Sequence, residues 1–542
     1  GQLNEPLYES ARPMSDFVQM EPRGGQPATE RTEVWLSYDQ RNIYVSFRAW
    51  ESDPSRAVVN ELRRDSNNIR QGDCIGFSFD TFRDRRNAAQ FEINPLGGRT
   101  DGQSTNERQF NADWNPVWDL AVGRFDGGWT VEAAIPFKSL RYTPGAAQVW
   151  GFQARRNNKW KNEISFLTTV PPAFGIGRGS FSASLYAMAG GFEAPPPGLN
   201  LEVKPYVVTD LTTDRLANPP YSNEPGAEVG LDMKYAVTQG VTADFTYNTD
   251  FAQVEADEQQ INLTRFNLFF PEKREFFLEN IGLFSFGGAG GTSTTADAGD
   301  TPIMFYSRRI GLNQSRVVPI LGGGRLTGRV GRYTFGAVNI QTRDTDAAPA
   351  PSTNFAVLRV RRDILRRSSI GAIATARSVA QNGSGASQLF GADGTFVFFN
   401  NLSFNTYAAR TVAEGVDGDD LSYRAQMEYI GDRYGVQVER LAVGANFTPE
   451  IGYVRRFDMR KNYGQFRFSP RARRITWLRK FSSIGTTSFI ENGRGVLESR
   501  HLDGEFALEL QNSDRLAVGL SNDYEFLRQP FAISSAVRIT PG

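Results

Sequence analysis

The second half of the chain alternates between apolar and polar residues. From Leu516 to Phe526 nearly every second residue is apolar or aromatic, the residues between are small or polar, and Asn522 is the one exception. Strand side chains point to opposite faces with a period of two, so the pattern predicts a strand with one apolar and one polar face. The same alternation recurs at residues 241–248, 423–429 and 505–511. A train of such segments, about ten residues each, predicts a transmembrane β-barrel with lipid outside and water inside.

The connections between these segments support the same interpretation. Very short turns at 238–240, 331–332, 400–401, 431–433 and 512–514 alternate with longer polar loops at 216–225, 344–353, 380–387 and 413–420. Outer-membrane barrels have short periplasmic turns and longer extracellular loops. A large soluble all-β protein is the alternative, but it has no reason to alternate loop length this regularly.

The first 191 residues have a different pattern. Short strands are expected at 34–38, 43–50, 74–80, 90–94, 129–135 and 150–155, separated by turn signals such as Asp126-Gly127-Gly128. This spacing predicts a β-sandwich. A Pro-rich linker at 192–200 follows, and its three consecutive prolines make it semi-rigid. The predicted fold is therefore all-β: a sandwich at 1–191, the linker, and a large antiparallel transmembrane β-barrel at 201–542. We expect about 20 strands, and we expect the C-terminal end of the barrel to be missing.

Loop lengths also predict the side on which the sandwich lies. The strand that starts at Val241 leaves a short turn and so runs outward from the periplasm. Counting back two strands, the strand that starts near Leu201 also begins on the periplasmic side. The predicted location is the cell outer membrane, with the N-terminal domain periplasmic or folded into the lumen as a plug. We favour the periplasmic position, because 191 residues would need a wide barrel.

Composition narrows the function classes. The chain has 542 residues with 60 basic and 60 acidic side chains, and this balance argues against a nucleic-acid partner. Its 40 phenylalanines suit lipid-facing girdles. The single cysteine, Cys74, excludes an internal disulfide framework, and we expect it to be a small core residue.

Two groups of motifs resemble known families. The stretches "TEVWLSYDQRNIYVSFRAWESDP", "GDCIGFSFDTFRDRRNAAQFEINPLGG" and "GGWTVEAAIPFKSLRY" resemble the carbohydrate-binding family 9-like β-sandwich, which is related to DOMON-type domains. The stretch "NTDFAQVEADEQQINLTRFNLFFPEKREFFLENIGLFSFG", with "FTPEIGYVRRFD" later, is similar to an outer-membrane β-barrel domain of unassigned function that follows such sandwiches in many Gram-negative proteins. The resemblance implies an outer-membrane location and supplies no reaction.

The residues needed for common enzyme chemistry are missing from the sequence. His501 is the only histidine, no nucleophile elbow accompanies it, and we expect it on an extended loop. Cys74 has no histidine or cysteine neighbour that would complete a zinc site. The glycine run at 287–291 lacks the Lys-Ser/Thr of a phosphate-binding loop. We therefore expect no catalysis.

Three tryptophans are the candidates for sugar binding. Trp114 and Trp118 lie in "QFNADWNPVWD", and Trp160 lies in "NNKWKNE", all within polar stretches. Proteins hold sugars by stacking a ring face on aromatic side chains, which polar stretches would leave accessible. The alternative is that these residues are tryptophans at the edge of the core.

No cofactor is expected. Carboxylates that could offer oxygen ligands to calcium are Asp73, Asp80, Asp84 and Asp119. No dense D-x-D-x-D-G loop accompanies them, so they are candidates on residue type alone.

The polar face of the barrel strands predicts a charged lumen. Predicted lumen charges are Arg359, Arg361, Asp244, Glu428, Glu505, Glu509, Asp523 and Glu525. Basic and acidic groups would lie on different arcs of the wall, where they would orient polar solutes; the alternative is ordinary solvated lumen chemistry. The stretch "FFPEKREFFLEN" mixes phenylalanines with charges and cannot face lipid throughout. It predicts a loop folded into the barrel, and the alternative is an interface girdle with a charged turn.

The predicted function is to bind or pass polar ligands, glycans among them, without catalysis. A second hypothesis is a structural barrel that anchors its sandwich as a docking module for envelope proteins. A third, weaker one is an enzyme accessory of polysaccharide breakdown. The expected partners are outer-membrane lipid, a glycan and envelope proteins.

Overall fold

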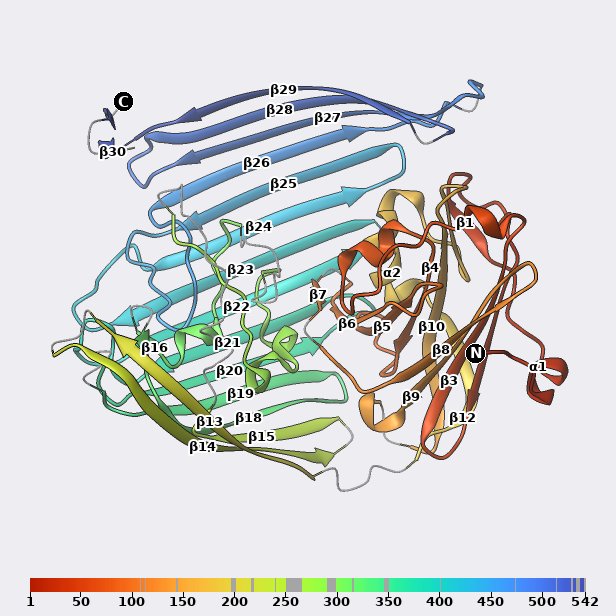
Figure 1. Ribbon diagram of the computed structural model, residues 1–542. Coiled ribbons are helices and arrows are strands. Elements are labelled where there is room, and N and C mark those ends of the chain that lie inside the picture. Colours follow the sequence, from red (N-terminus) through yellow and green to blue (C-terminus); the bar gives the residue numbers. More distant parts are fainter. Residues whose placement is uncertain are drawn as a thin grey trace.

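The computed structural model shows an all-β chain with two parts (Figure 1). It describes residues 1–107, 109–112, 114–142, 145–195, 201–215, 219–238, 240–249, 266–289, 299–313, 316–345, 350–399, 401–472, 474–512, 514–527, 530–532 and 537–540. Predictions for the linker residues 196–200, for 251–265, for the glycine-rich tract at 290–298 and for turn residues 239, 400 and 513 fall outside the described residues.

The N-terminal part is a sandwich of two sheets. One sheet has the order β1-β11-β10-β4-β5-β6-β7, with β12 also paired to β10; the other has the order β2-β3-β9-β8. The first comprises β1 (Val18–Glu21), β4 (Cys74–Asp80), β5 (Ala88–Ile93), β6 (Arg99–Thr105), β7 (Gln109–Asn111), β10 (Ala147–Asn158), β11 (Glu163–Phe166) and β12 (Ala187–Glu193). The second comprises β2 (Thr32–Tyr38), β3 (Asn42–Trp50), β8 (Asp119–Phe125) and β9 (Gly128–Pro136). The strands predicted from the sequence all form.

A single apolar core lies between these two sheets. It contains Val45, Phe77, Phe91, Val131 and Trp150, each from a different strand. Alternate residues of each strand supply it, which is the period-two pattern expected of a sandwich. The sandwich also contains the short helices α1 (Pro6–Ser10), η1 (Pro54–Arg56), η2 (Asn67–Gln71), η3 (Phe137–Ser139), η4 (Pro172–Phe174), α2 (Gly175–Phe181) and η5 (Ala183–Leu185). Phe137 of η3 belongs to the core.

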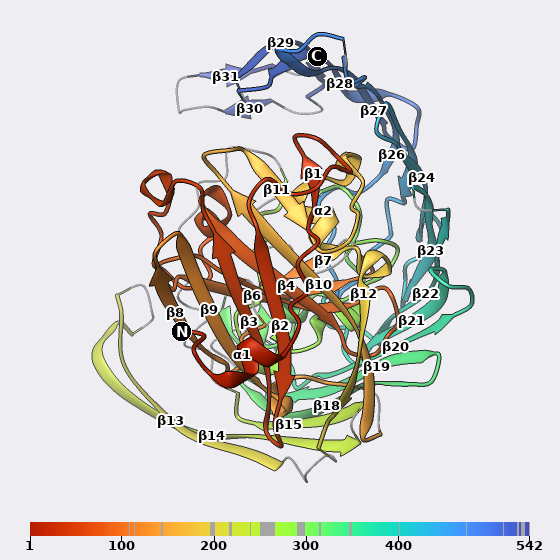
Figure 2. The same ribbon diagram turned by 90° about the vertical axis from the view of Figure 1, so that its right-hand side faces the viewer.

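The second part is one long antiparallel sheet, which we call the barrel sheet. Among the described residues it has 15 strands, with β13 and β29 at its two ends. They are β13 (Leu201–Asp214), β14 (Tyr221–Thr238), β15 (Val241–Tyr247), β18 (Ile320–Val330), β19 (Tyr333–Thr342), β20 (Asn354–Asp363), β21 (Ser369–Arg377), β22 (Ser387–Phe398), β23 (Leu402–Ala413), β24 (Leu421–Ile430), β25 (Tyr434–Val443), β26 (Met459–Phe468), β27 (Leu478–Glu491), β28 (Leu497–Leu510) and β29 (Arg515–Glu525). Figure 2 shows the sheet curling in a wide arc. Two short pairs, β16 (Leu312–Asn313) with β17 (Arg316–Val317) and β30 (Phe531–Ala532) with β31 (Arg538–Ile539), lie outside it.

The strand number differs from the sequence prediction of about 20. Several strands are longer than the ten residues assumed: β14 has 18, and β27 and β28 have 14 each. In addition, the described residues between β15 and β18 add no strand to the barrel sheet. Both effects use chain length without adding strands.

That stretch folds against the inner face of the sheet. We call residues 266–289 and 299–313 the folded-in segment; it contains α4 (Glu275–Leu278), η6 (Ile281–Phe284) and η7 (Ser307–Arg309). Phe276, Phe277 and Phe305 of this segment share one buried cluster with strand residues such as Val338 and Leu441. The prediction of a folded-in loop at "FFPEKREFFLEN" is therefore confirmed, and the segment fills part of the space inside the arc.

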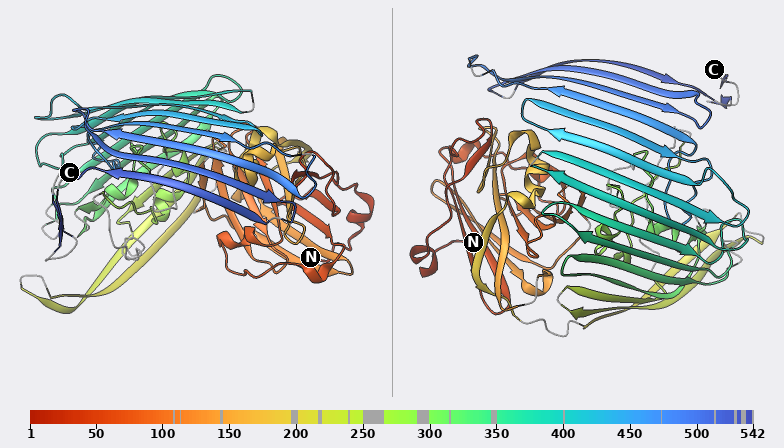
Figure 3. Two further views of the ribbon diagram at one scale, coloured as in Figure 1. Left: turned by 90° about the horizontal axis from the view of Figure 1, so that it is seen from above. Right: turned by 180° about the vertical axis from the view of Figure 1, so that it is seen from behind.

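The connections β14–β15, β18–β19, β22–β23, β24–β25 and β28–β29, each of at most four residues, lie at one end of the barrel sheet, which we call the short-turn end. The sandwich lies against that end (Figure 3). The register pairs Leu201 with Tyr235 and Thr238 with Val241, so β13 also begins at the short-turn end. The linker therefore meets the barrel sheet at the short-turn end, as the alternation of loop lengths predicts.

Candidate functional site

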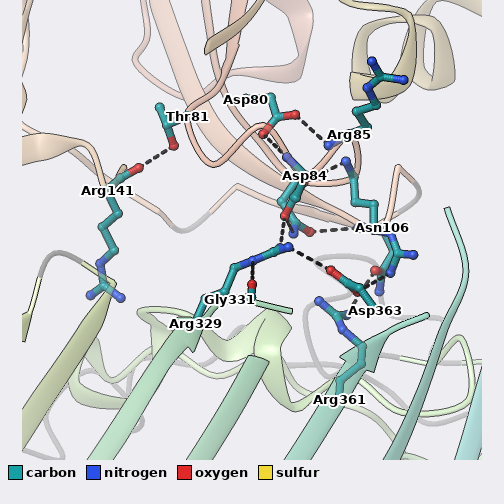
Figure 4. Close-up of polar contacts among 12 residues, drawn as sticks. Asp80, Thr81, Asp84, Arg85, Asn106, Arg141, Arg329, Gly331, Arg361 and Asp363 are labelled. Atoms are coloured by element: carbon teal, nitrogen blue, oxygen red, sulfur yellow. Dashed lines mark hydrogen bonds and ion pairs between the residues drawn. The ribbon is translucent and has the colours of Figure 1, made fainter. Parts of the chain in front are cut away.

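Several contacts between the two parts lie in one cluster of charged side chains, which we call the interface cluster. Its members are Asp80, Asp84, Arg86, Arg329 and Asp363 (Figure 4). The end of β4 supplies Asp80, the turn between β4 and β5 supplies Asp84 and Arg86, and the ends of β18 and β20 supply the other two. This is where the sandwich meets the short-turn end of the barrel sheet.

Arg86 of the sandwich contacts the barrel sheet directly. It is only 4% exposed, its Nη1 donates to Asp363 Oδ1 at 2.6 Å, and its Nη2 donates to the backbone oxygen of Ser368. Its backbone N–H donates to Asp84 Oδ1 at 2.8 Å, which fixes the turn that presents it. A buried guanidinium costs free energy unless it is paired, so this contact requires the two parts to be docked.

Arg329 makes the reverse connection from the barrel sheet. Its Nη1 donates to Asp84 Oδ2 at 2.6 Å and its Nη2 donates to Asp363 Oδ2 at 2.8 Å. Opposite charges thus alternate from Asp84 through Arg329 and Asp363 to Arg86. Each carboxylate and each guanidinium has an oppositely charged partner, which makes this cluster an ion-pair latch between sandwich and barrel sheet.

Asp80 lies behind this latch at the end of β4. Its carboxylate accepts from the backbone N–H of Asp84 at 3.1 Å and of Arg85 at 2.7 Å. Burial raises the pKa of Asp80 to about 8, and the neighbouring Asp84 carboxylate acts in the same direction. Asp80 therefore keeps its proton to a higher pH than an ordinary aspartate does.

Further contacts flank the cluster. Arg361 Nη1 donates to Asn106 Oδ1 at 3.0 Å, and Arg367 donates to Glu107. Arg141 of the sandwich pairs with Glu279, which belongs to the folded-in segment. The sandwich is therefore attached both to the barrel sheet and to the segment inside it.

Several of the predicted lumen charges lie on the inner face in local ion pairs. On β20, Arg359 is 1% exposed whereas its neighbour Leu358, on the outer face, is 51% exposed. Arg359 pairs with Asp393, and Asp244 pairs with Arg325. Glu509 pairs with Arg479 and Lys480, and Glu428 with Arg178 of α2. Opposite charges on neighbouring elements neutralise one another, so these residues do not form the opposed arcs expected from the sequence.

At the end of the sheet the inner face is more exposed. Asp523 lies opposite His501 on the neighbouring strand, and the two side chains are in hydrogen-bond contact. Both lie on the same face of the sheet as Glu505 and Glu525. His501 thus lies within β28, not on the predicted loop. The error arose because the polar residues around His501 were interpreted as a loop, although they alternate with outward-facing ones.

Inside the arc, the folded-in segment satisfies its own buried charges. Arg274 Nη2 donates to Glu272 Oε2 at 2.7 Å, and its two terminal nitrogens also donate to the backbone oxygens of Ile310 and Ser307. Charges in "PEKRE" therefore stabilise the segment's own conformation.

The three candidate tryptophans have different surroundings. Trp118 is 2% exposed, belongs to the sandwich core and donates from Nε1 to Asp101 Oδ2 at 2.9 Å. Trp114 is half-buried against the same core. The ring of Trp160 has the cations of Arg56 and Lys161 within 5.1 and 5.0 Å of its centroid. The structure does not bring the three rings together into one described platform, and sugar stacking on them stays a prediction.

The calcium candidates are scattered. Asp80 and Asp84 adjoin, Asp73 accepts from the backbone of Val58 and Lys159, and Asp119 is exposed on β8. Among the described residues no group of three or more His, Cys, Asp or Glu side chains could hold a metal ion. Cys74 is a buried free thiol.

Sequence reasoning missed Arg86, Arg329 and Asp363. The available signal was the run "RDRR" in the turn after β4. Four consecutive charged residues are more than a short turn requires to be solvated. Nothing in the sequence indicates that its partners lie more than 240 residues away.

One family model matches part of the chain. Residues 196–319 match a family described as "Domain of unknown function (DUF5916)". This stretch includes the first motif of the second resemblance, residues 248–287, but not the later motif at 447–458. No curated protein matches the sequence. The resemblance of the first 191 residues to carbohydrate-binding family 9 stays a prediction.

Several solved structures show a distant likeness to this chain. OccK8 (OprE) of Pseudomonas aeruginosa has 10% identity and a TM-score of 0.27, covering 83% of this chain and 98% of its own. OccAB2 of Acinetobacter baumannii has 10% identity and a TM-score of 0.27, covering 83% and 91%. The outer membrane protein opdK of Pseudomonas aeruginosa has 9% identity and a TM-score of 0.23, covering 84% and 93%. Among the described residues no helix is long and apolar enough to cross a membrane.

Proposed function

We propose that this protein is an outer-membrane β-barrel whose own sandwich domain caps its short-turn end, and that it binds or passes polar ligands, glycans among them, without catalysis. One observation carries the proposal: the barrel sheet has an exposed apolar outer face and a buried, charged inner face. The interface cluster then holds the cap in place.

The outer face is apolar over most of the arc. Its exposed large side chains include Val203, Val207, Val229, Phe245, Leu326, Leu358, Val360, Phe390, Leu421, Tyr423, Phe466, Phe506, Leu516, Val518 and Leu520. Soluble monomers rarely expose contiguous apolar patches larger than a few hundred Å². Contact with membrane lipid accounts for an exposed apolar face of this size, and this supports an outer-membrane location.

The position of the sandwich supports a capped barrel. Short turns mark the periplasmic side of outer-membrane barrels, so the sandwich would be periplasmic. The folded-in segment occupies the inner face and contacts the sandwich through Glu279 and Arg141. Passage of a ligand along the inner face would therefore require the sandwich to move away.

A barrel that anchors its sandwich as a docking module is the second candidate. The filled inner face favours it, because an anchor needs no pore. Release of a trapped oligosaccharide from vesicles that contain the full chain distinguishes the two: release supports passage, and retention by correctly inserted protein supports the anchor.

Membrane insertion itself is tested at Leu358, which lies midway along β20 on the outer face. We expect Leu358→Arg to cost ~2–4 kcal/mol of folding free energy in lipid vesicles, because an arginine near the bilayer midplane is poorly solvated. Denaturant titration of vesicle-inserted protein measures this cost.

The matched control is Gln388→Arg, which places the same side chain on an exposed residue near the end of β22. Near the membrane interface the expected cost is only ~0–1 kcal/mol. Equal, small effects at both positions would show that the outer face does not lie in lipid.

A further inference from the structure

The sheet that contains β4, β5 and β10 has a second buried face, on the side away from the core. Its side chains alternate with core residues and are polar: Ser78, Gln90, Glu92, Gln153 and Arg155. All are buried. The outer face of a sandwich sheet normally lies in water, so a polar face that is covered needs a reason.

Helix α2 is part of the cover. The backbone oxygen of Ser180 accepts from Gln90 Nε2 at 3.3 Å, and Ser180 Oγ accepts from Arg155 Nη1 at 3.0 Å. Arg155 lies over Gly76, where an added Cβ would come within 3.3 Å of Arg155 Nη2. Glycine at this position leaves room for the guanidinium on the sheet.

A cavity of about 10 Å³ remains beneath α2, and two polar atoms around it have no partner. Gln90, 2% exposed, leaves Oε1 unpaired, and Arg155, 3% exposed, leaves Nε unpaired. One is an acceptor and the other a donor, and both residues line the same cavity. A hydroxyl group satisfies both at once, because it donates one hydrogen bond and accepts others.

The charges around the cavity favour an anion. Arg155 Nη2 donates to Glu92 Oε1 at 2.9 Å, and Arg70 Nε donates to Glu92 Oε2 at 2.6 Å. Two guanidinium groups thus share one carboxylate. Burial opposes ionisation of Glu92, but the two arginines outweigh it and hold its pKa below the ordinary value. The surplus positive charge, together with the hydroxyl-sized gap, suits an acidic sugar.

Helix α2 has a low intrinsic helix propensity and contacts the barrel sheet. Three of the seven residues of α2 are glycines, at 175, 177 and 179, which disfavour a helix. Arg178 of α2 pairs with Glu428 of β24 at 3.5 Å, and Ile430 packs against the apolar cluster that includes Phe174. In Figure 2, α2 lies on the side of the sandwich that faces the barrel sheet.

We propose that the polar face beneath α2 binds an acidic glycan, and that this binding and the docking of the sandwich on the barrel sheet exclude each other. The inference rests on the proposed function and deepens it: the docked sandwich keeps α2 closed, and a sandwich released from β24 can open it. Ligand in the periplasm would then favour the undocked cap.

The test uses the full chain in detergent micelles, with fluorescent oligogalacturonate as the probe and neutral galacto-oligosaccharide as its uncharged match. Arg178→Ala removes the contact with β24, and we expect it to bind oligogalacturonate roughly threefold tighter than the unmodified chain, because a partly exposed ion pair is weak. Adding Gln90→Leu should weaken binding at least about tenfold, since a ligand hydroxyl loses its buried acceptor. Arg124→Ala, a surface change on β8, should bind like the unmodified chain.

Hydrogen exchange gives an independent readout. Ligand should speed exchange of the amides at 175–181, because α2 opens. The proposal is overturned if folded Arg178→Ala protein does not bind, because an ordered water would then be the occupant of the cavity. It is also overturned if Gln90→Leu leaves binding unchanged, or if the neutral oligosaccharide binds equally well. Binding that is lost only in Trp114→Ala with Trp160→Ala would overturn it too, because the site would then lie at the tryptophans. None of these depends on membrane insertion, which the Leu358 experiment tests separately.

Discussion

Replacing Arg86 with glutamate is expected to release the sandwich from the barrel sheet. The change puts a carboxylate next to Asp363 and removes both the ion pair and the hydrogen bond to the Ser368 backbone oxygen. Breaking a buried pair typically costs about 3–5 kcal/mol, because the remaining charge is left buried without a partner. Spin labels at the exposed positions Lys138 and Arg366 report the docking: the unmodified chain should give one narrow distance distribution, and Arg86→Glu a broad one.

The adjacent residue supplies the control. Arg85 makes its described contact through its backbone N–H, and its side chain is exposed, so Arg85→Glu has the same charge change without touching Asp363. It should keep the narrow distribution. Adding Asp363→Lys to Arg86→Glu should restore docking in part, since the pair is then reversed, although Arg329 loses a partner. A narrow distribution in Arg86→Glu itself would show that other contacts suffice to hold the cap.

The barrel sheet was the part of the fold most accessible from the sequence. Leu358 and Arg359 are adjacent in sequence and lie on opposite faces, and this alternation follows from strand geometry alone. Loop lengths similarly placed the start of β13 at the short-turn end. Strand number was less accessible, because the period of two does not say where a strand ends, as the 18 residues of β14 show.

The candidate site was mostly out of reach of sequence reasoning. Asp84 was noted as a carboxylate, but its partner Arg329 is 245 residues away and only the docking of two parts brings them together. Trp118 shows the opposite problem: a tryptophan in a polar stretch can still pack into the core when its neighbours alternate. Pairing across domains depends on tertiary geometry, which local patterns do not contain.

Stability of the sandwich is expected to fall as the pH rises from about 4 to about 8, and Asp80 to be the main cause. Burial, followed by the Asp84 carboxylate, raises the pKa of Asp80 to about 8, above the 3.8 of an ordinary aspartate. The folded state therefore holds a proton that the unfolded state releases, and the stabilisation is complete below about pH 4 and lost as the pH passes through the folded pKa. The rise of the pKa from 3.8 to about 8 corresponds to about 6 kcal/mol, which is an upper bound on the contribution of Asp80.

Tryptophan fluorescence during urea unfolding measures the effect, because Trp477 is the only one of the 8 tryptophans outside residues 1–191. Asp80→Asn should reduce the pH dependence, above all between about pH 6 and pH 8, since asparagine cannot ionise yet keeps an oxygen for the backbone N–H of Arg85. Asp101, whose pKa burial raises to about 6, should keep its own contribution at lower pH. Asp119→Asn makes the same change at an exposed carboxylate and should retain it. If Asp80→Asn unfolds with the same dependence on pH as the unmodified chain, the proton is held elsewhere. A loss confined to Asp80→Asn would instead place a titrating group directly behind the ion-pair latch, so that the pH and the docking of the sandwich act on the same turn.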